Sequence, residues 1–151
     1  MAVSMTVIAG CSNLTATSLA FPITVAAGSS QIPTATGSVT ATCSSGVTAL
    51  LGFNAGANVS GTVTVPVLKG PGTTGSQTIA YGIYSDSAFG TPFPAVTAPT
   101  TTPAGGTTIT GGAAFPVTVY GQIGATTAGA TVSPTIAAGA YTDTLTATIY
   151  F

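Results

Sequence analysis

The chain has 151 residues, of which 45% are hydrophobic and only 2% are charged. Lys69 is its single basic residue, Asp86 and Asp143 are its only acids, and it contains no histidine. One lysine cannot form the basic patch that nucleic-acid binding requires. A chain without His or Glu also offers few groups for acid–base catalysis. We therefore expect no enzyme activity, no cofactor, no small-molecule substrate and no nucleic-acid partner.

The length suits one domain with a sizeable core. Solubility must depend largely on hydroxyl groups, because the chain carries 31 Thr, and the low net charge of −1 favours self-association. The first ten residues lack the basic start and the long apolar run of a signal peptide. No run of about 18 apolar residues is present to span a bilayer. We therefore expect a mature, already processed chain.

Short segments rich in β-branched residues follow one another along the chain, separated by 20 Gly and 10 Pro. Their alternating patterns and the turn residues between them are typical of an all-β sandwich or barrel. Residues 91–108 are too rich in Pro, Thr and Gly for a core strand, so we expect a long surface loop there. The expected strands cover residues 1–7, 13–21, 37–43, 46–53, 61–68, 77–84, 114–123 and 141–151.

The last of these strands raises a question about its free edge. From Tyr141 onward the residues alternate strictly, with hydroxyl-bearing side chains on one face. That period of two indicates a strand with one buried face. A strand at the end of the chain has no following strand to pair with, so its outer edge needs another cover. The face expected to be buried carries Tyr141, Asp143, Leu145, Ala147, Ile149 and Phe151.

The residues with reactive side chains have simple structural interpretations. Asp86 follows a predicted strand in a turn-like sequence, and Asp143 near a strand start can bond local backbone amides. Cys11 and Cys43 fit either a disulfide or two buried thiols. The composition is typical of extracellular proteins, in which disulfides persist, and this favours the disulfide. Two cysteines without histidine provide too few ligands for zinc, so we expect no metal site.

Six stretches together resemble the spore coat protein U domain family, which includes the subunits of archaic chaperone-usher pili. These stretches follow one another in the same order as in that family and have similar sequence patterns, and the resemblance covers nearly the whole chain. A fairly specific combination is formed by the Cys pair, the aromatic strand ending in Tyr-Ser-Asp, the VYGQI strand and the Gly-x-Tyr-x-Asp-Thr-Leu ending followed by a terminal Phe. The stretches are CSNLTATSLAFP, ATGSVTATCSSG, LGFNAGANVSGT, IAYGIYSDSAFGTP, FPVTVYGQI and AGAYTDTLTATIYF.

The resemblance implies an immunoglobulin-like sandwich that lacks its last strand. Residues 1–10 would then be a donor strand extension and residues 11–151 the pilin domain. The donor strand would bury Met1, Val3, Met5 and Val7 in a neighbouring subunit, and the alternative is that residues 1–9 pair within their own subunit or are disordered. The acceptor groove would be formed by Leu145, Ala147, Ile149 and Phe151 of that neighbour.

The resemblance also implies a function, a location and partners. The chain would be the structural subunit of an extracellular pilus at the cell surface, serving adhesion and biofilm formation. Its partners would be identical subunits in a homopolymeric filament and, during transit of the periplasm, a chaperone and an outer-membrane usher. The alternatives are a spore or cell-surface coat protein of the same fold that builds no pilus, and a Thr-rich module that binds ice or glycans.

Overall fold

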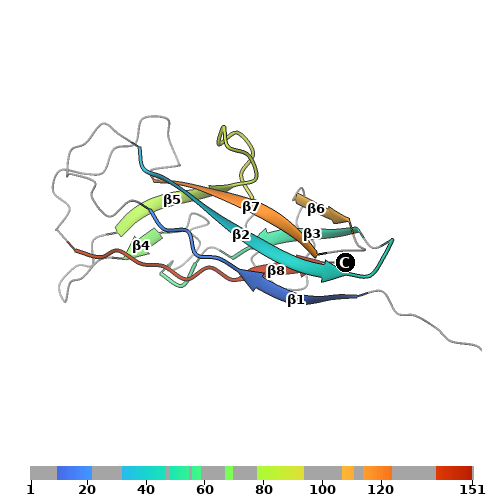
Figure 1. Ribbon diagram of the computed structural model, residues 1–151. Helices are drawn as coiled ribbons and strands as arrows, with labels where there is room; N and C mark the ends of the chain where they lie inside the picture. The colour runs from blue at the N-terminus through green and yellow to red at the C-terminus, as the bar shows by residue number, and fades with distance from the viewer. Residues whose placement is uncertain are drawn as a thin grey trace, which may run out of the picture.

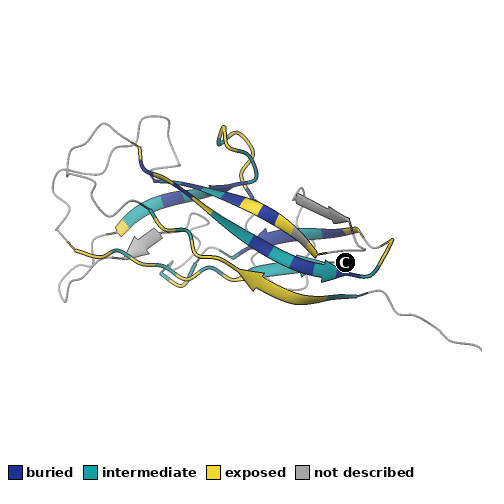
Figure 2. Ribbon diagram, viewed as in Figure 1, coloured by how far each residue is buried: buried dark blue, intermediate teal, exposed yellow. Residues whose placement is uncertain are grey.

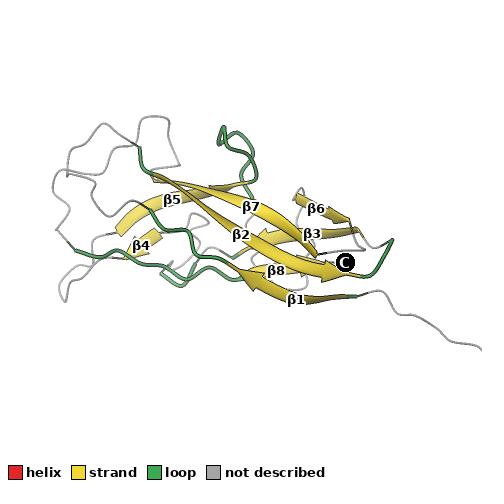
Figure 3. Cartoon of the chain, viewed as in Figure 1, coloured by secondary structure: helices red, strands yellow, loops and turns green. Residues whose placement is uncertain are grey.

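The computed structural model describes residues 10–21, 32–46, 48–54, 56–58, 67–69, 78–93, 107–110, 114–123 and 139–150. These residues form strands and loops without any helix (Figure 3), and the all-β prediction is confirmed. In this part of the chain, nothing helical is long and apolar enough to cross a membrane. The predicted strand at residues 1–7 lies outside the described residues.

Two antiparallel sheets make up the fold (Figure 1). The first has the strand order β1-β2-β7-β5-β4, with β1 and β4 at its edges. The second has the order β6-β3-β8. The bounds are β1 Cys11–Ala16, β2 Thr34–Cys43, β3 Thr48–Phe53, β4 Val67–Lys69, β5 Thr78–Tyr84, β6 Thr107–Thr110, β7 Ala114–Ile123 and β8 Ala147–Tyr150.

The centre of the first sheet is the β2–β7 pair, which runs without interruption from Thr34↔Gln122 to Thr42↔Ala114. Alternate residues of both strands point inward, because successive side chains of a strand lie on opposite faces. The inward set is apolar and the outward set of β2 is mostly Thr. Figure 2 shows the resulting bands of burial on β2 and β7, while β1 is exposed along most of its length.

The core lies between the inner faces of the two sheets. Leu51 of β3 is completely buried, and Val39 of β2 and Val119 of β7 are nearly so. Phe93 also belongs to this cluster, and its ring meets that of Phe53 edge-on with centroids 5.0 Å apart. The apolar area that these residues remove from water is the main stabilising contribution to the sandwich.

Two strand predictions and one loop prediction need correction. The strand expected at 13–21 begins at Cys11 and ends at Ala16, because the chain then leaves the sheet edge. Of the strand expected at 141–151, residues 141–146 lie outside β8, although they are hydrogen-bonded, and Phe151 lies outside the described residues. Strand β6 lies partly within the loop expected at 91–108 and was not predicted, and buried Phe93 shows that the start of that segment joins the core.

Candidate functional site

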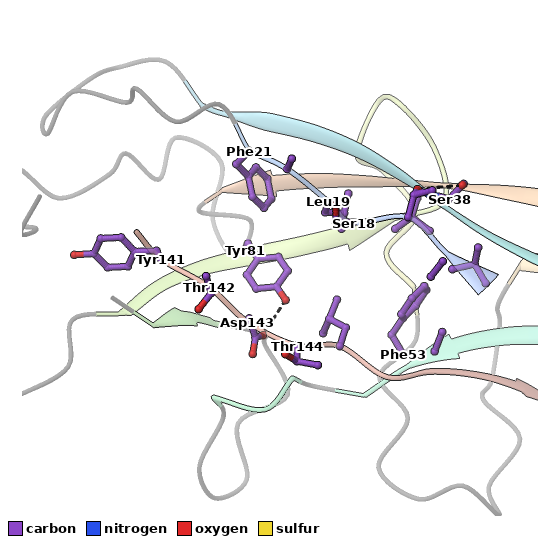
Figure 4. A pocket seen from close by; sticks show the side chains of 17 residues that line it. Ser18, Leu19, Phe21, Ser38, Phe53, Tyr81, Tyr141, Thr142, Asp143 and Thr144 are labelled. Carbon is purple, nitrogen blue, oxygen red and sulfur yellow. Dashed lines mark hydrogen bonds between the residues drawn. The ribbon is translucent and has the colours of Figure 1, made fainter. Parts of the chain in front are cut away.

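A groove of about 590 Å³ opens between the two sheets along one side of the sandwich (Figure 4). One wall is the segment 16–21, which follows edge strand β1. The other wall is the segment 141–147, which leads into edge strand β8. The groove therefore lies where the edge of one sheet faces the edge of the other.

The floor of the groove is apolar. Val39, Val119 and Phe53 line it, and each of these side chains is at most 5% exposed. They are inward-facing residues of β2, β7 and β3, so the floor is continuous with the hydrophobic core. An extended segment with apolar side chains at alternate positions matches such a floor, because it would remove further apolar area from water.

The first wall turns inward from the sheet edge. Thr17 still pairs with β2, since its amide donates to the Ser38 carbonyl at 2.8 Å. Beyond Thr17 the side chains of Leu19 and Phe21 pack on the inner face of the sheet, beside Gly37 of β2 and Gly121 of β7. A Cβ atom at Gly121 would lie 2.9 Å from Phe21 Cζ, and one at Gly37 would lie 2.9 Å from the Thr17 carbonyl oxygen. These two glycines leave the space that the wall occupies.

The main chain of the second wall is bonded to residues 54–58 through its even-numbered residues. The Asn54 amide donates to the Thr146 carbonyl at 3.0 Å, and the Ala57 amide donates to the Thr144 carbonyl at 3.0 Å. Asn58 Nδ2 donates to the Thr142 carbonyl at 2.7 Å. In an extended chain, neighbouring residues direct their main-chain groups to opposite sides. The main-chain groups of the odd-numbered residues 143, 145 and 147 therefore face the open side, where an added strand would pair.

Asp143 connects this wall to two other segments. Its Oδ1 accepts hydrogen bonds from the Ala57 amide at 3.1 Å, the Asn58 amide at 3.2 Å and Asn58 Nδ2 at 2.9 Å. Its Oδ2 accepts from the Tyr81 hydroxyl of β5 at 2.9 Å, the contact drawn in Figure 4. Burial raises the pKa of Tyr81, and the hydrogen bond to Asp143 and its negative charge raise it further. The phenol therefore remains a hydrogen-bond donor in the ordinary pH range.

From the sequence, Asp143 is expected to bond local amides, and the structure differs on this point. The amides belong to residues 57 and 58, far away in the sequence. Gly56 adopts a φ of 94° beside the carboxylate, and a Cβ there would lie 2.9 Å from Asp143 Cγ. Asp143 shares the inward face with Leu145 and Ala147, and a single acid on an apolar strand face is the signal that marks its role.

Asp86 is the other acid, and it occupies the turn expected after β5. Its carboxylate accepts hydrogen bonds from the amides of Ala88 at 2.9 Å, Gly90 at 3.1 Å and Thr91 at 2.6 Å. The bond from Gly90, followed by those from Thr91 and Ala88, holds the pKa of this carboxyl below its usual value. The turn lies away from the groove, so Asp86 serves local loop structure.

The two cysteines form the predicted disulfide. Cys11 opens β1 and Cys43 closes β2, and the two residues lie directly opposite each other in the pairing of these strands. Next to the bridge, the Ser44 amide donates to the Gly10 carbonyl at 2.9 Å. The bridge therefore fixes the point at which the chain that precedes β1 joins the sandwich.

Two of the four predicted groove residues lie together in the groove wall. Leu145 and Ala147 line the groove. Ile149 packs against the core and pairs with Leu51. Phe151 and the predicted donor residues Met1, Val3, Met5 and Val7 lie outside the described residues. The floor residues and the wall residues Leu19 and Phe21 were not predicted, although their alternate apolar spacing could have indicated a buried face.

No three His, Cys, Asp or Glu side chains lie close enough to hold a metal ion, as far as the described residues extend. Among the described residues, the titratable side chains that line the groove are Tyr81, Tyr141 and Asp143. An apolar floor between two sheet edges fits an extended peptide chain better than a polar ligand, because main-chain pairing and side-chain burial act together there.

Comparisons with known proteins identify a family model and a solved structure that are similar to this chain. The model of the Spore Coat Protein U domain family matches residues 1–148. A chain from the crystal structure of the CsuC–CsuE chaperone–tip adhesion subunit pre-assembly complex, from archaic chaperone-usher Csu pili of Acinetobacter baumannii, has a TM-score of 0.56 and 16% sequence identity. The alignment covers 97% of this chain and 40% of that chain. At this identity the likeness concerns the fold. Comparison with curated protein sequences gives no match.

Proposed function

Because the chain belongs to the Spore Coat Protein U domain family, we propose that it is a structural subunit of an extracellular pilus that assembles by donor-strand exchange. In this assembly, residues 1–9 of one copy fill the groove of the next copy. A periplasmic chaperone occupies the groove before assembly, and an outer-membrane usher passes the subunit to the cell surface. Adhesion and biofilm growth are the roles that such a filament serves.

The observation that carries the proposal is the groove between the edges of the two sheets. Its floor is apolar, and its second wall directs the main-chain groups of residues 143, 145 and 147 to the open side. A strand added there would pair with that edge and bury its alternate side chains on Val39, Phe53 and Val119. An edge of this kind left uncovered promotes aggregation, so it needs a regular occupant.

The proposed occupant has the required pattern. Met1, Val3, Met5 and Val7 alternate with small or hydroxyl-bearing residues. Their burial would contribute on the order of 6 to 12 kcal/mol before the cost of ordering the segment. Because the disulfide holds Cys11 at the base of β1, the ten preceding residues are attached at a fixed point of the sandwich.

A coat protein that does not polymerise and a Thr-rich binding module remain the alternatives. The outward face of β2 carries a row of hydroxyl residues, which is the feature that favours the binding module. On β7, however, Ala114 and Pro116 oppose Thr42 and Thr40, so the hydroxyls do not form regular ranks across the two strands. Electron microscopy separates these functions, since thin fibres with a one-subunit repeat support the pilus and isolated particles or shells contradict it.

Substitutions on the two faces of the donor segment test the mechanism. Val7→Asp and Met5→Asp would bury an unpaired charge in the neighbour's groove, so we expect polymerisation to be blocked. Ser4→Asp and Thr6→Asp, on the opposite face, are the matched controls and should polymerise far better. Fibre content and particle size are the measurements. Equal behaviour of the two faces would contradict donor-strand exchange.

Two changes of chain length complete the test. A chain lacking residues 1–8 should keep an acceptor groove and lose the ability to donate, so it should form no fibres. Fusing a copy of residues 1–9 after Phe151 through a flexible linker should fill the groove within the same chain and yield a stable monomer. Fibres from the truncated chain would overturn the proposal.

A further inference from the structure

The wall formed by residues 141–147 is held in two different ways along its length. At its C-terminal end it becomes β8, whose register with β3 is an ordinary backbone ladder from Phe53↔Ala147 to Leu50↔Tyr150. Residues 142–146 instead combine two backbone bonds, from the Asn54 and Ala57 amides, with several bonds that involve side chains. Asn54 Oδ1 accepts from the Thr146 amide at 2.7 Å, and the side chains of Asn58 and Asp143 make further connections.

The reason is the path of the chain after β3. Gly56, with its φ of 94°, turns residues 56–58 away from a regular strand, so the β3–β8 register ends at Phe53↔Ala147. The Ala57 amide still donates to the Thr144 carbonyl, and the amides of Ala57 and Asn58 both donate to the Asp143 carboxylate as well. One carboxylate therefore supplements the weakened backbone pairing at this position.

The chemistry of the position suits a carboxylate in particular. Asp143 receives four hydrogen bonds, and every partner acts as a donor, including the buried Tyr81 hydroxyl. An ionised carboxylate accepts on both oxygens and carries no competing donor. An alanine would leave the two amides, Asn58 Nδ2 and the Tyr81 hydroxyl without this acceptor.

We propose that Asp143 is a positioning residue for donor capture, which holds residues 142–146 as an extended edge before any donor strand arrives. This inference rests on the proposed function. The preformed edge presents the main-chain groups of Asp143 and Leu145 to the incoming strand, so that capture does not require this half of the wall to fold. Donor capture then avoids the entropic cost of ordering the edge.

The experiment uses the full chain and two readouts. The first is amide hydrogen exchange, resolved for residues 142–146, for 56–58 and for β7. The second is the rate at which the chain captures a fluorescent synthetic peptide with the sequence of residues 1–9. In Asp143→Ala we expect exchange at 142–146 and 56–58 to rise about tenfold or more, with β7 unchanged, and peptide capture to slow by a similar factor.

Graded variants keep the test decisive if Asp143→Ala fails to fold. Asp143→Asn retains an oxygen for the three donors on Oδ1, so its capture rate should stay within about threefold of the parent chain. Tyr81→Phe removes one hydrogen bond of the four, and we expect an intermediate increase in exchange that is confined to residues 142–146.

Asp86→Ala is the matched control, because it also removes a carboxylate that accepts from backbone amides, three in this case, but in a turn outside the groove. Both variants are compared at the same interval below their own Tm values. If Asp143→Ala resembles Asp86→Ala in capture rate and in exchange at 142–146, or if Tyr81→Phe leaves that exchange unchanged, the positioning role is wrong. If the parent chain captures no peptide, the proposed function fails, and the exchange readout alone decides the role of Asp143.

Discussion

The β2–β7 pair and the groove wall at residues 141–147 are both extended segments, but they are stabilised differently. The β2–β7 pair has backbone partners on both sides of each strand, because β1 and β5 flank it. Among the described residues, the wall is bonded along the side of β3 and residues 54–58, where the side chains of Asn54 and Asn58 and the wall's own Asp143 add to the backbone bonds. A closed ladder needs only an alternating sequence, whereas an edge kept open needs specific polar residues to hold it.

The largest difference in stability between the two regions should appear when one leucine in each region is replaced by alanine. Leu51 is completely buried on β3, so Leu51→Ala should reduce the free energy of unfolding by about 3 to 5 kcal/mol. Leu145 is half-buried in the groove wall, so Leu145→Ala should cost less in unfolding and should weaken peptide capture more. Urea unfolding and capture of the residue 1–9 peptide provide the two measurements. A larger stability loss at Leu145 would contradict the comparison.

The disulfide should rank second in its effect on stability. It links residues 32 positions apart in the sequence, and the chain-entropy model assigns about 3 to 4 kcal/mol to a loop of this size. Cys43→Ser, studied together with the double variant Cys11→Ser/Cys43→Ser, should lower the yield of folded subunit and the urea midpoint. Mass spectrometry without reduction should show the two peptides linked in the parent chain. Free thiols at both positions would remove the basis of this prediction.

A smaller effect is expected at the glycines under the first wall. Gly121→Ala places a Cβ 2.9 Å from Phe21 Cζ, and this should push the wall into the groove at a cost of about 1 to 3 kcal/mol. Gly10→Ala is the control, since a Cβ there meets nothing within 4 Å. Peptide capture should slow in Gly121→Ala only. The additional change Phe21→Leu should restore part of the loss, and absence of any rescue would mean that the ring does not transmit the effect.

The smallest effect concerns pH. The pKa of Tyr81 is raised by burial first and by Asp143 next, so the folded state keeps a proton that the unfolded state releases above about pH 10. Stability should therefore fall as pH rises beyond that value. The pKa of Asp86 is lowered by the Gly90 amide and its neighbours, so its contribution is present above the usual value of 3.8 and is lost as pH falls below it.

Thermal unfolding measured from acid to alkaline pH checks both expected losses of stability. Tyr81→Phe should flatten the alkaline fall, and Asp86→Asn should reduce the acid-side loss. Between about pH 5 and 9 the Tm should change little, because few groups titrate there. A fall of tens of degrees between pH 7 and pH 4 would contradict this expectation.

The sequence predicted the closed part of the fold better than the open part. The strand at 114–123 matches β7 residue for residue, since strict alternation between turn residues is a local signal. The same reasoning extended the strand predicted at 13–21 beyond the end of β1. Leu19 and Phe21 continue the alternation there, although the chain has already moved inside the sandwich. Strand β6 was missed because its Thr-rich sequence continues the composition of the preceding loop.

The groove was only partly predictable for a related reason. Leu145 and Ala147 were found through their alternation, which a single strand displays by itself. The floor depends on which faces of β2, β7 and β3 meet, and Asp143 depends on amides that are far away in the sequence. Such pairings arise from the packing of whole sheets, and no local period encodes them.

The position of the disulfide has a mechanical consequence for a filament joined as proposed. Tension along such a filament enters each subunit through residues 1–9 and reaches Cys11, the first residue of β1. There the covalent bridge passes the load to Cys43 and into β2, whose ladder with β7 would have to shear along its whole length. Strand β1, an edge strand with few backbone partners, is thereby protected from being peeled away one hydrogen bond at a time. A pulling experiment on the reduced and oxidised subunit would show this as a lower rupture force after reduction.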